Sequence, residues 1–230
     1  MNKKIAVVTG SDSTLLPILE LSLDSKIKYA NKHQYELIVV KEWDNISVNF
    51  ADLRAKYDLR SIIGYLRAAY VFELLKTYNI VMWIDADAFI TNSEYSLTDI
   101  TDDEHCFYAS YDWMHIGSFS TGNFIVKRHD IVHELYSKFI HLSKIYNTSS
   151  NEQLLLNHIY ESDLRLNRHM KVMPHKYLNS VPKCVEETRT WHDRSRVHTP
   201  WTEDSFILHL TSLPHEERVA ILNSGALTFK

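Results

Sequence analysis

Apolar positions along the chain follow two different spacings, and their order predicts strands that alternate with helices. Short apolar runs predict buried strands over residues 4–10, 35–40 and 80–84. Between these runs, apolar residues recur at helical spacing and predict helices over 14–31 and 59–78. A strand–helix–strand order of this kind favours a largely parallel sheet with helices on its faces.

The second half of the chain continues this alternation. We expect further strands over 106–112, 123–128 and 206–210, helices near 129–145 and 150–161, and a polar loop over 41–52. On the first helix, the apolar side chains are expected to face the core: Leu15, Ile18, Leu19, Leu21 and Leu23.

Composition narrows the class of protein. A chain of 230 residues with 5 glycines, 5 prolines and no visible linker is predicted to form one domain over residues 1–230. A net charge of −4 provides no basic field for nucleic acid or an anionic membrane surface. No apolar run approaches the length of a membrane span or a signal segment. Cys106 and Cys184 resemble reduced thiols, although one disulfide stays open.

Two aspartates, Asp85 and Asp87, directly follow the apolar run 80–84. Burying bare carboxylates is costly, so their position needs a reason. Carboxylates two residues apart on an extended segment point the same way, and both can then bind one divalent cation. In open sheets, ligands bind beyond the carboxyl ends of the strands, which is where this pair lies. The structural alternative is a turn or a helix cap, since Asp commonly serves both.

Three classes of protein fit such a pair. A hard cation that also binds phosphate oxygens would neutralise a leaving nucleoside diphosphate, as a glycosyltransferase requires. A magnesium-dependent phosphohydrolase would instead use the first aspartate as a nucleophile on phosphorus. Phosphohydrolases usually carry the motif on their first strand, whereas two predicted strands precede it here. A non-catalytic sugar-binding module is the third possibility.

Six segments in order resemble a known family: "IKYANKHQYELIVV" (27–40), "LRAAYVFELLKTYNIVMWIDADAFITN" (66–92), "STGNFIVKR" (120–128), "NEQLLLNHI" (151–159), "MPHKYLNSVP" (173–182) and "SFILHLTSLPHEER" (205–218). They resemble GT-A glycosyltransferases of the family that holds yeast-type galactosyl- and mannosyltransferases and plant xyloglucan xylosyltransferases. The likeness to the glycogenin and lipopolysaccharide galactosyltransferase family is looser. The resemblance implies a single-domain GT-A fold of class α/β, with a mostly parallel central sheet flanked by helices.

The resemblance also implies a metal site. In such families the two aspartates bind Mn²⁺, or Mg²⁺, which grips the diphosphate of the donor, so the motif Asp85, Ala86 and Asp87 is expected at the donor. A histidine on a late strand supplies a further ligand, and His209 matches it. Imidazole beside carboxylates suits Mn²⁺ better than Ca²⁺. A lone histidine on an apolar strand is otherwise a core residue.

The expected donor contacts extend along the chain. By resemblance, the donor site includes Val8, Thr9 and Gly10 near the base, Arg67 near the donor, and Thr121, Gly122 and Asn123 near the sugar. Each has a structural alternative, such as a strand-end turn at Gly10 or an exposed helix arginine at Arg67. Asn179 and Ser180 match another family segment, where a turn is equally compatible.

The resembled family transfers sugars with retention and opens a helix with an acidic–glutamine pair. Glu152 and Gln153 occupy that place, and Gln153 is the group expected near the anomeric carbon. A plain first helical turn would also favour glutamate there. The looser family continues after its histidine to a lysine that contacts the diphosphate. This chain lacks that lysine, which leaves Arg218 or His215 to supply a cation. The resemblance implies transfer from a nucleotide sugar, chiefly a UDP-sugar, to a glycan or other hydroxyl acceptor. Eukaryotic relatives usually carry a membrane anchor, and because none is visible here we expect a bacterial or viral enzyme that works in the cytosol.

Overall fold

The structure, a computed structural model of the chain, describes most residues: 3–41, 43, 51–112, 118–146, 152–182, 200–211 and 213–223. Cys184 and most of the loop expected over 41–52 lie outside this part, and helix α2 (Ala51–Lys56) already begins at Ala51. Cys106 is a buried free thiol, and burial raises its pKa to about 12. Within the described ranges, no helix has the length and apolar character that crossing a membrane would require.

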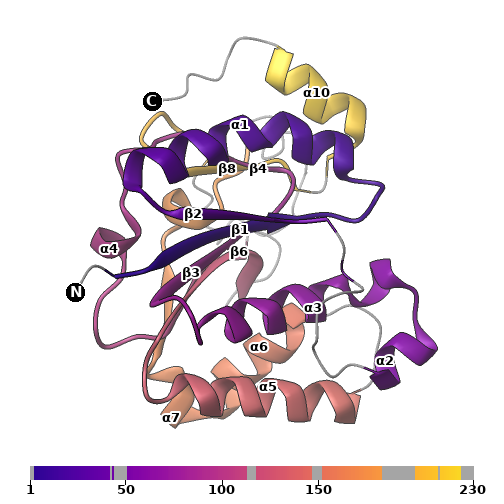
Figure 1. Cartoon of the computed structure of the whole chain (residues 1–230), viewed down its shortest axis with the longest axis vertical. Coiled ribbons are helices and arrows are strands. Elements are labelled where there is room, and N and C mark those ends of the chain that lie inside the picture. Colours follow the sequence, from indigo (N-terminus) through magenta and orange to yellow (C-terminus); the bar gives the residue numbers. More distant parts are fainter. Residues whose placement is uncertain are drawn as a thin grey trace, which may run out of the picture.

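A six-stranded sheet forms the centre of the molecule, in the order β2-β1-β3-β6-β5-β7 (Figure 1). Its strands are β1 (Ile5–Gly10), β2 (Glu36–Val40), β3 (Ile80–Ile84), β5 (Phe107–Tyr111), β6 (Phe119–Lys127) and β7 (Met170–Met173). Strand β6 is antiparallel to both of its neighbours, and the other strands share one direction. The predicted mostly parallel α/β sheet is therefore confirmed. Strand β7 was not predicted, and β6 begins earlier than expected.

A second, two-stranded sheet pairs β4 (Ala88–Ile90) with β8 (Ile207–His209) in antiparallel fashion. Strand β4 follows the paired aspartates and was not predicted. In this pairing Ala88 lies opposite His209, so β8 lies beside the segment that directly follows the two aspartates.

Helices cover both faces of the large sheet (Figure 1). Helix α1 (Leu16–His33), the small sheet and α10 (His215–Asn223) lie on one side. On the other side lie α3 (Leu59–Leu74), α5 (Val132–Tyr146), α6 (Glu152–Ser162) and α7 (Leu164–Asn167). Two short helices, α4 (Leu97–Ile100) and α8 (His175–Leu178), complete the described part.

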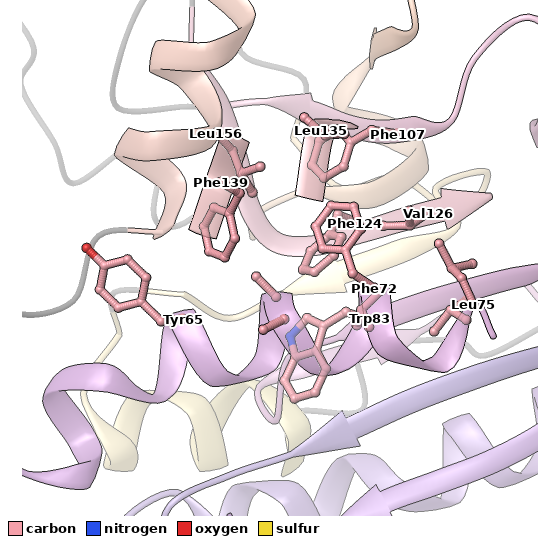
Figure 2. Close-up of a cluster of buried hydrophobic side chains, with 14 of the residues drawn as sticks. Tyr65, Phe72, Leu75, Trp83, Phe107, Phe124, Val126, Leu135, Phe139 and Leu156 are labelled. Atoms are coloured by element: carbon pink, nitrogen blue, oxygen red, sulfur yellow. The ribbon is translucent and has the colours of Figure 1, made fainter. Parts of the chain in front are cut away.

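The central strands separate two hydrophobic clusters because their side chains alternate between the faces. On β3, Met82 packs in the cluster beneath α1, whereas Val81 and Trp83 pack in the cluster beneath α3, α5 and α6. Figure 2 shows the second cluster, in which Trp83 lies beside α3 near Phe72 and Phe124. Both faces of β3 are thus buried, which explains why its sequence is a continuous apolar run.

Helix α1 departs from the expected pattern of burial. Ile18 and Leu19 are buried as predicted, but Leu21 is 50% exposed. The polar Ser22 and Lys26, one turn apart, are fully buried instead. The expectation for Leu21 was wrong because α1 buries a different face. The face that carries Ser22 and Lys26 packs against the polar turn that follows β3.

Candidate metal and donor site

The chain turns where β3 ends. Ala88 N donates a hydrogen bond of 3.1 Å to Asp85 O, which closes a turn over Asp85, Ala86 and Asp87 before β4 begins. The expected extended segment was therefore wrong, and the two carboxylates converge because the chain reverses. The structural role expected for Asp in turns coexists here with a clustered site.

Three potential ligands meet at this turn. Oxygens of Asp85 and Asp87 and a ring nitrogen of His209 all lie within 4.8 Å of one another. His209 Nε2 is 3.3 Å from Asp87 Oδ1 and 3.7 Å from Asp85 Oδ2. Within the described residues, no other group of three such side chains is close enough to share an ion.

His209 is held in a defined orientation. It is 2% exposed, and its Nδ1 lies 2.9 Å from Asn179 Oδ1. Asn179 Nδ2 donates to Tyr111 O at 3.1 Å, so the amide oxygen faces the imidazole and accepts a proton from Nδ1. Nδ1 therefore points at Asn179 and Nε2 points at the aspartates, which is the orientation of a histidine that binds a metal through Nε2. The alternative of an ordinary core histidine does not account for this direction.

Asp85 uses one oxygen for protein contacts. Its Oδ1 accepts hydrogen bonds from Trp83 Nε1 at 2.7 Å and Arg67 Nη1 at 2.5 Å, while Oδ2 faces His209. Burial raises the pKa of Asp85, although Arg67 and His209 oppose the rise. Trp83 was not among the predicted site residues. Alternation along β3 places it on the same face as Asp85, and this is the signal that could have identified it.

Asp87 is stabilised as an anion. Burial favours its neutral form, but His209 and Arg218 outweigh that cost and lower its pKa to about 2. Arg218 Nη2, from α10, lies 3.3 Å from Asp87 Oδ2. Its Nε is buried and finds no hydrogen-bond partner among the described residues. His215, the other cation considered, is exposed.

Arg67 joins the aspartates to α6. Its guanidinium bonds Glu152 Oε1 through Nη2 and through Nε, the latter at 3.1 Å. Burial lowers the pKa of Arg67, but Asp85 and Glu152 outweigh this effect and raise it above its usual value. Arg67 is therefore not an exposed helix arginine. Gly64 on α3 leaves the space that the Glu152 carboxylate fills, because a Cβ there would collide with it.

The first turn of α6 is fixed against β6. Thr121 Oγ1 donates to Glu152 Oε1 at 2.9 Å, and Thr121 N donates to Gln153 Oε1 at 3.0 Å. Gln153 Nε2 donates to Asp112 Oδ2 at 2.7 Å. Glu152 is 5% exposed and accepts bonds from two side chains, whereas Gln153 is half-buried. Gln153 is therefore the member of the pair that retains access to a ligand.

Gly122 and Asn123 support the ligands directly. A Cβ on Gly122 would collide with the ring of His209 and would lie 3.0 Å from Asp85 Oδ2. Asn123 accepts a bond from Asp85 N at 3.1 Å and donates to Leu178 O at 2.8 Å. Asn123 is 1% exposed, so in this structure its amide orders the turn.

The end of β1 lies beside the turn, because Val8 pairs with Trp83. Val8 is buried in the core, whereas the hydroxyls of Thr9 and Ser11 are buried without a partner among the described residues. Gly10 permits a close approach: a Cβ there would lie 2.8 Å from Val40 O. Close packing against β2 thus requires a glycine here, and the contact of Gly10 with a donor stays a prediction.

Residues 1–106 match the galactosyl transferase GMA12/MNN10 family. This match confirms the resemblance that the sequence predicted. No curated protein matches the chain in sequence.

Solved glycosyltransferases share the fold at low identity. One that is involved in the glycosylation of the major capsid of PBCV-1 is 18% identical, with a TM-score of 0.63 over 96% of this chain and 99% of that one. The galactosyltransferase LgtC, solved with donor and acceptor sugar analogs, is 15% identical, with a TM-score of 0.55 over 98% and 97%. GlyE of Streptococcus pneumoniae TIGR4 is 16% identical, with a TM-score of 0.54, and the chain spans 90% of its own length but about half of GlyE, 54%. The fold is thus that of GT-A glycosyltransferases, and with the family match it supports a transferase.

In this glycosyltransferase candidate, the fold brings several predicted residues together at the carboxyl end of β3. Asp85, Asp87 and His209 converge there, and Arg67 reaches the same carboxylates from α3. Ala86 is buried and contributes its carbonyl, which accepts a bond from Ser22 Oγ at 2.7 Å. Ser22 was not among the predicted residues.

Proposed function

We propose that the chain is a metal-dependent glycosyltransferase that moves a sugar from a UDP-sugar to a hydroxyl of a glycan acceptor, with retention at the anomeric carbon. The observation that carries the proposal is the convergence of Asp85, Asp87 and His209 at the carboxyl end of β3 in a glycosyltransferase fold. We further propose that residues 1–230 form one catalytic domain.

The ligand atoms at the turn suit Mn²⁺ or Mg²⁺. Two carboxylate oxygens and an imidazole nitrogen face one point, and the nitrogen favours Mn²⁺ of the two. When bound, the ion would offset the charge of the departing diphosphate. Trp83 and Arg67 hold Asp85 Oδ1, so Oδ2 is the oxygen directed at the ion.

Arg218 is the cation that we assign to the diphosphate. It pairs with Asp87, and its buried Nε has no partner among the described residues. Leaving a buried charged donor unpaired is costly, so a diphosphate oxygen would stabilise this arginine. Arg218 thus replaces the lysine that the sequence lacks.

The remaining groups fit the donor in the order that the fold presents them. The unpaired hydroxyls of Thr9 and Ser11 at the end of β1 suit the base or ribose. Gln153, half-buried and oriented by Thr121 and Asp112, is assigned to the anomeric carbon. Glu152 acts through Arg67 and does not itself contact the sugar.

A panel of nucleotide sugars tests the function. We expect Mn²⁺-dependent hydrolysis or transfer that releases a nucleoside diphosphate, with UDP-sugars preferred over GDP-sugars. Calorimetric titration with UDP and GDP, each with and without Mn²⁺, measures the binding step. Equal affinity without the metal would show that arginines and backbone amides, and not the aspartates, hold the phosphates.

The phosphohydrolase alternative makes a different prediction. A nucleophilic Asp85 would form an aspartyl-phosphate that can be trapped in the wild-type protein. One oxygen of Asp85 already accepts two hydrogen bonds and the other faces His209, which suits a ligand better than a nucleophile. A trapped phospho-aspartate would overturn the proposed transferase. A sugar-binding module would show neither the adduct nor nucleotide release.

A further inference from the structure

Lys26 is buried on α1 directly behind the aspartate turn. Its side chain is 0% exposed, and its ammonium contacts Ser22 Oγ at 2.6 Å and Asp85 O at 2.9 Å. Within the described part of the chain, the ammonium forms no ion pair with a carboxylate. Burial lowers the pKa of Lys26 to about 7, although the charges of Asp87 and Asp85 oppose this fall. Burying this amine is costly, so the position needs a compensating role.

Ser22 lies one helical turn before Lys26 and completes the contact. Its hydroxyl donates to Ala86 O at 2.7 Å and also receives the bond from Lys26. The two side chains occupy neighbouring positions on one face of the helix, because residues four apart in a helix lie above one another. Together they bind two consecutive carbonyls of the turn.

The backbone of the turn is thereby held at every carbonyl. Asp85 O accepts from Lys26 and from Ala88 N, Ala86 O accepts from Ser22, and Asp87 O accepts from Leu210 N at 2.9 Å. Leu210 directly follows β8, the strand that carries His209, whereas the other two contacts come from α1. The direction of the Asp85 carboxylate therefore depends on a helix that contributes no metal ligand.

We propose that Lys26 and Ser22 are positioning residues: they hold the carbonyls of Asp85 and Ala86 so that the carboxylates of Asp85 and Asp87 face a single cation. This inference rests on the proposed metal-dependent function and names the part of the fold that pre-forms its site. A metal site binds tightly when its ligands are already oriented, because less ordering is required upon binding.

Three variants of α1 test this role. Lys26→Met removes the ammonium but keeps an unbranched side chain, and Ser22→Ala removes one hydroxyl. Tyr29→Phe is the matched control, because Tyr29 is equally buried on the same helix and its hydroxyl donates to Tyr95 O, away from the turn. For each protein we would measure UDP affinity with and without Mn²⁺, the electron paramagnetic resonance spectrum of bound Mn²⁺, and the melting temperature.

We expect Lys26→Met and Ser22→Ala to weaken Mn²⁺-dependent UDP binding by about 10- to 100-fold, the usual range for groups that orient metal ligands. They should change the spectrum of bound Mn²⁺ and leave metal-free UDP affinity unaltered. Tyr29→Phe should lower the melting temperature without affecting Mn²⁺. Should Lys26→Met not fold, the smaller change Ser22→Ala decides alone.

Two results would overturn the inference, and they are distinct. Wild-type affinity for Mn²⁺ and UDP in the Ser22→Ala and Lys26→Met variants would refute the positioning role, as would an equal loss of affinity in Tyr29→Phe. Absence of any Mn²⁺ effect in the wild-type protein would instead refute the proposed function, and the inference with it.

Discussion

Among the described residues, a network around Asp102 and a network around Asp85 and Asp87 differ in how fully their hydrogen-bonding groups are paired. In the first, Asp102 accepts bonds from Lys171 Nζ at 2.8 Å, His105 Nδ1 at 2.7 Å and Tyr108 Oη at 3.1 Å. Although burial opposes ionisation, these bonds hold the pKa of Asp102 well below its usual value. The side chain is 33% exposed, so solvent completes its shell.

The second network lies at the end of β3 and is less satisfied. Burial raises the pKa of Asp85, one oxygen of Asp85 faces His209 without a short bond, and Arg218 retains an unpaired buried Nε. The Asp102 network resembles a structural ion pair, whose members are matched to one another. The Asp85 and Asp87 network has unused capacity directed at one point, and such unused capacity indicates a ligand.

Replacing Asp85 or Asp87 should have the largest effect and should distinguish the two networks most clearly. We expect Asp85→Asn and Asp87→Asn to lower turnover by about 10²-fold or more, the cost of losing a main electrostatic stabiliser. Both should abolish the rise in melting temperature that Mn²⁺ with UDP produces in the wild-type protein.

The matched control is Asp102→Asn, which removes a carboxylate from the satisfied network. It should retain turnover and the full Mn²⁺- and UDP-dependent rise in melting temperature. Full Mn²⁺-dependent transfer by either variant of the turn would contradict the assignment of these aspartates to a metal.

A smaller effect is expected from the residue that orients His209. Asn179→Leu removes the acceptor for His209 Nδ1, so the ring loses its fixed tautomer. We expect Mn²⁺ affinity to fall by about 10- to 100-fold, as for other partners of ligating histidines. The comparable change in the other network is Tyr108→Phe, which removes a donor to Asp102. It should reduce stability and leave Mn²⁺ affinity unchanged, and a loss of Mn²⁺ affinity there would show that the networks are coupled.

Arg218→Gln tests the cation assigned to the diphosphate. We expect UDP affinity in the presence of Mn²⁺ to fall by about tenfold, as expected for the loss of one charge-assisted hydrogen bond. Arg165→Gln, at an exposed position on α7, is the control and should bind UDP as the wild type does. An Arg218→Gln protein with wild-type affinity would assign the arginine to Asp87 alone.

The sequence predicted the parts of the fold that contain a long apolar run or apolar residues at helical spacing. Strands β1 and β3 were found because they are buried along their whole length, and β2 because its sequence is a run of apolar residues. The three-residue strand β4 and the four-residue β7 were missed because such short segments carry no resolvable period. The equally short β8 was predicted because it lies within the run "FILHL" (206–210), which is largely apolar.

The site was predicted unevenly for a related reason. Asp85, Asp87 and His209 were identifiable from residue type and context, but their convergence depends on a turn and on the pairing of β4 with β8. Ser22 and Lys26 were passed over in favour of Leu21, since an apolar pattern cannot show that a helix face packs on a polar turn. The spacing of Ser22 and Lys26 became informative only when both were seen to be buried.

The smallest expected effect concerns stability in acid. The pKa of Asp102 is lower in the folded protein than in the unfolded chain, so its contribution to stability is present above the unfolded value and is lost as the pH falls toward the folded one. Asp102→Asn should therefore lower the melting temperature at pH 7 by about 2–4 °C, the shift that about 1 kcal/mol produces in a chain of this size. The difference between variant and wild type should shrink below about pH 4, where Asp102 begins to take up a proton in the unfolded chain. Melting curves of both proteins from pH 7 to pH 3 check this, and a difference that stays constant over that range would show that Asp102 stabilises the fold by packing and not by its charge.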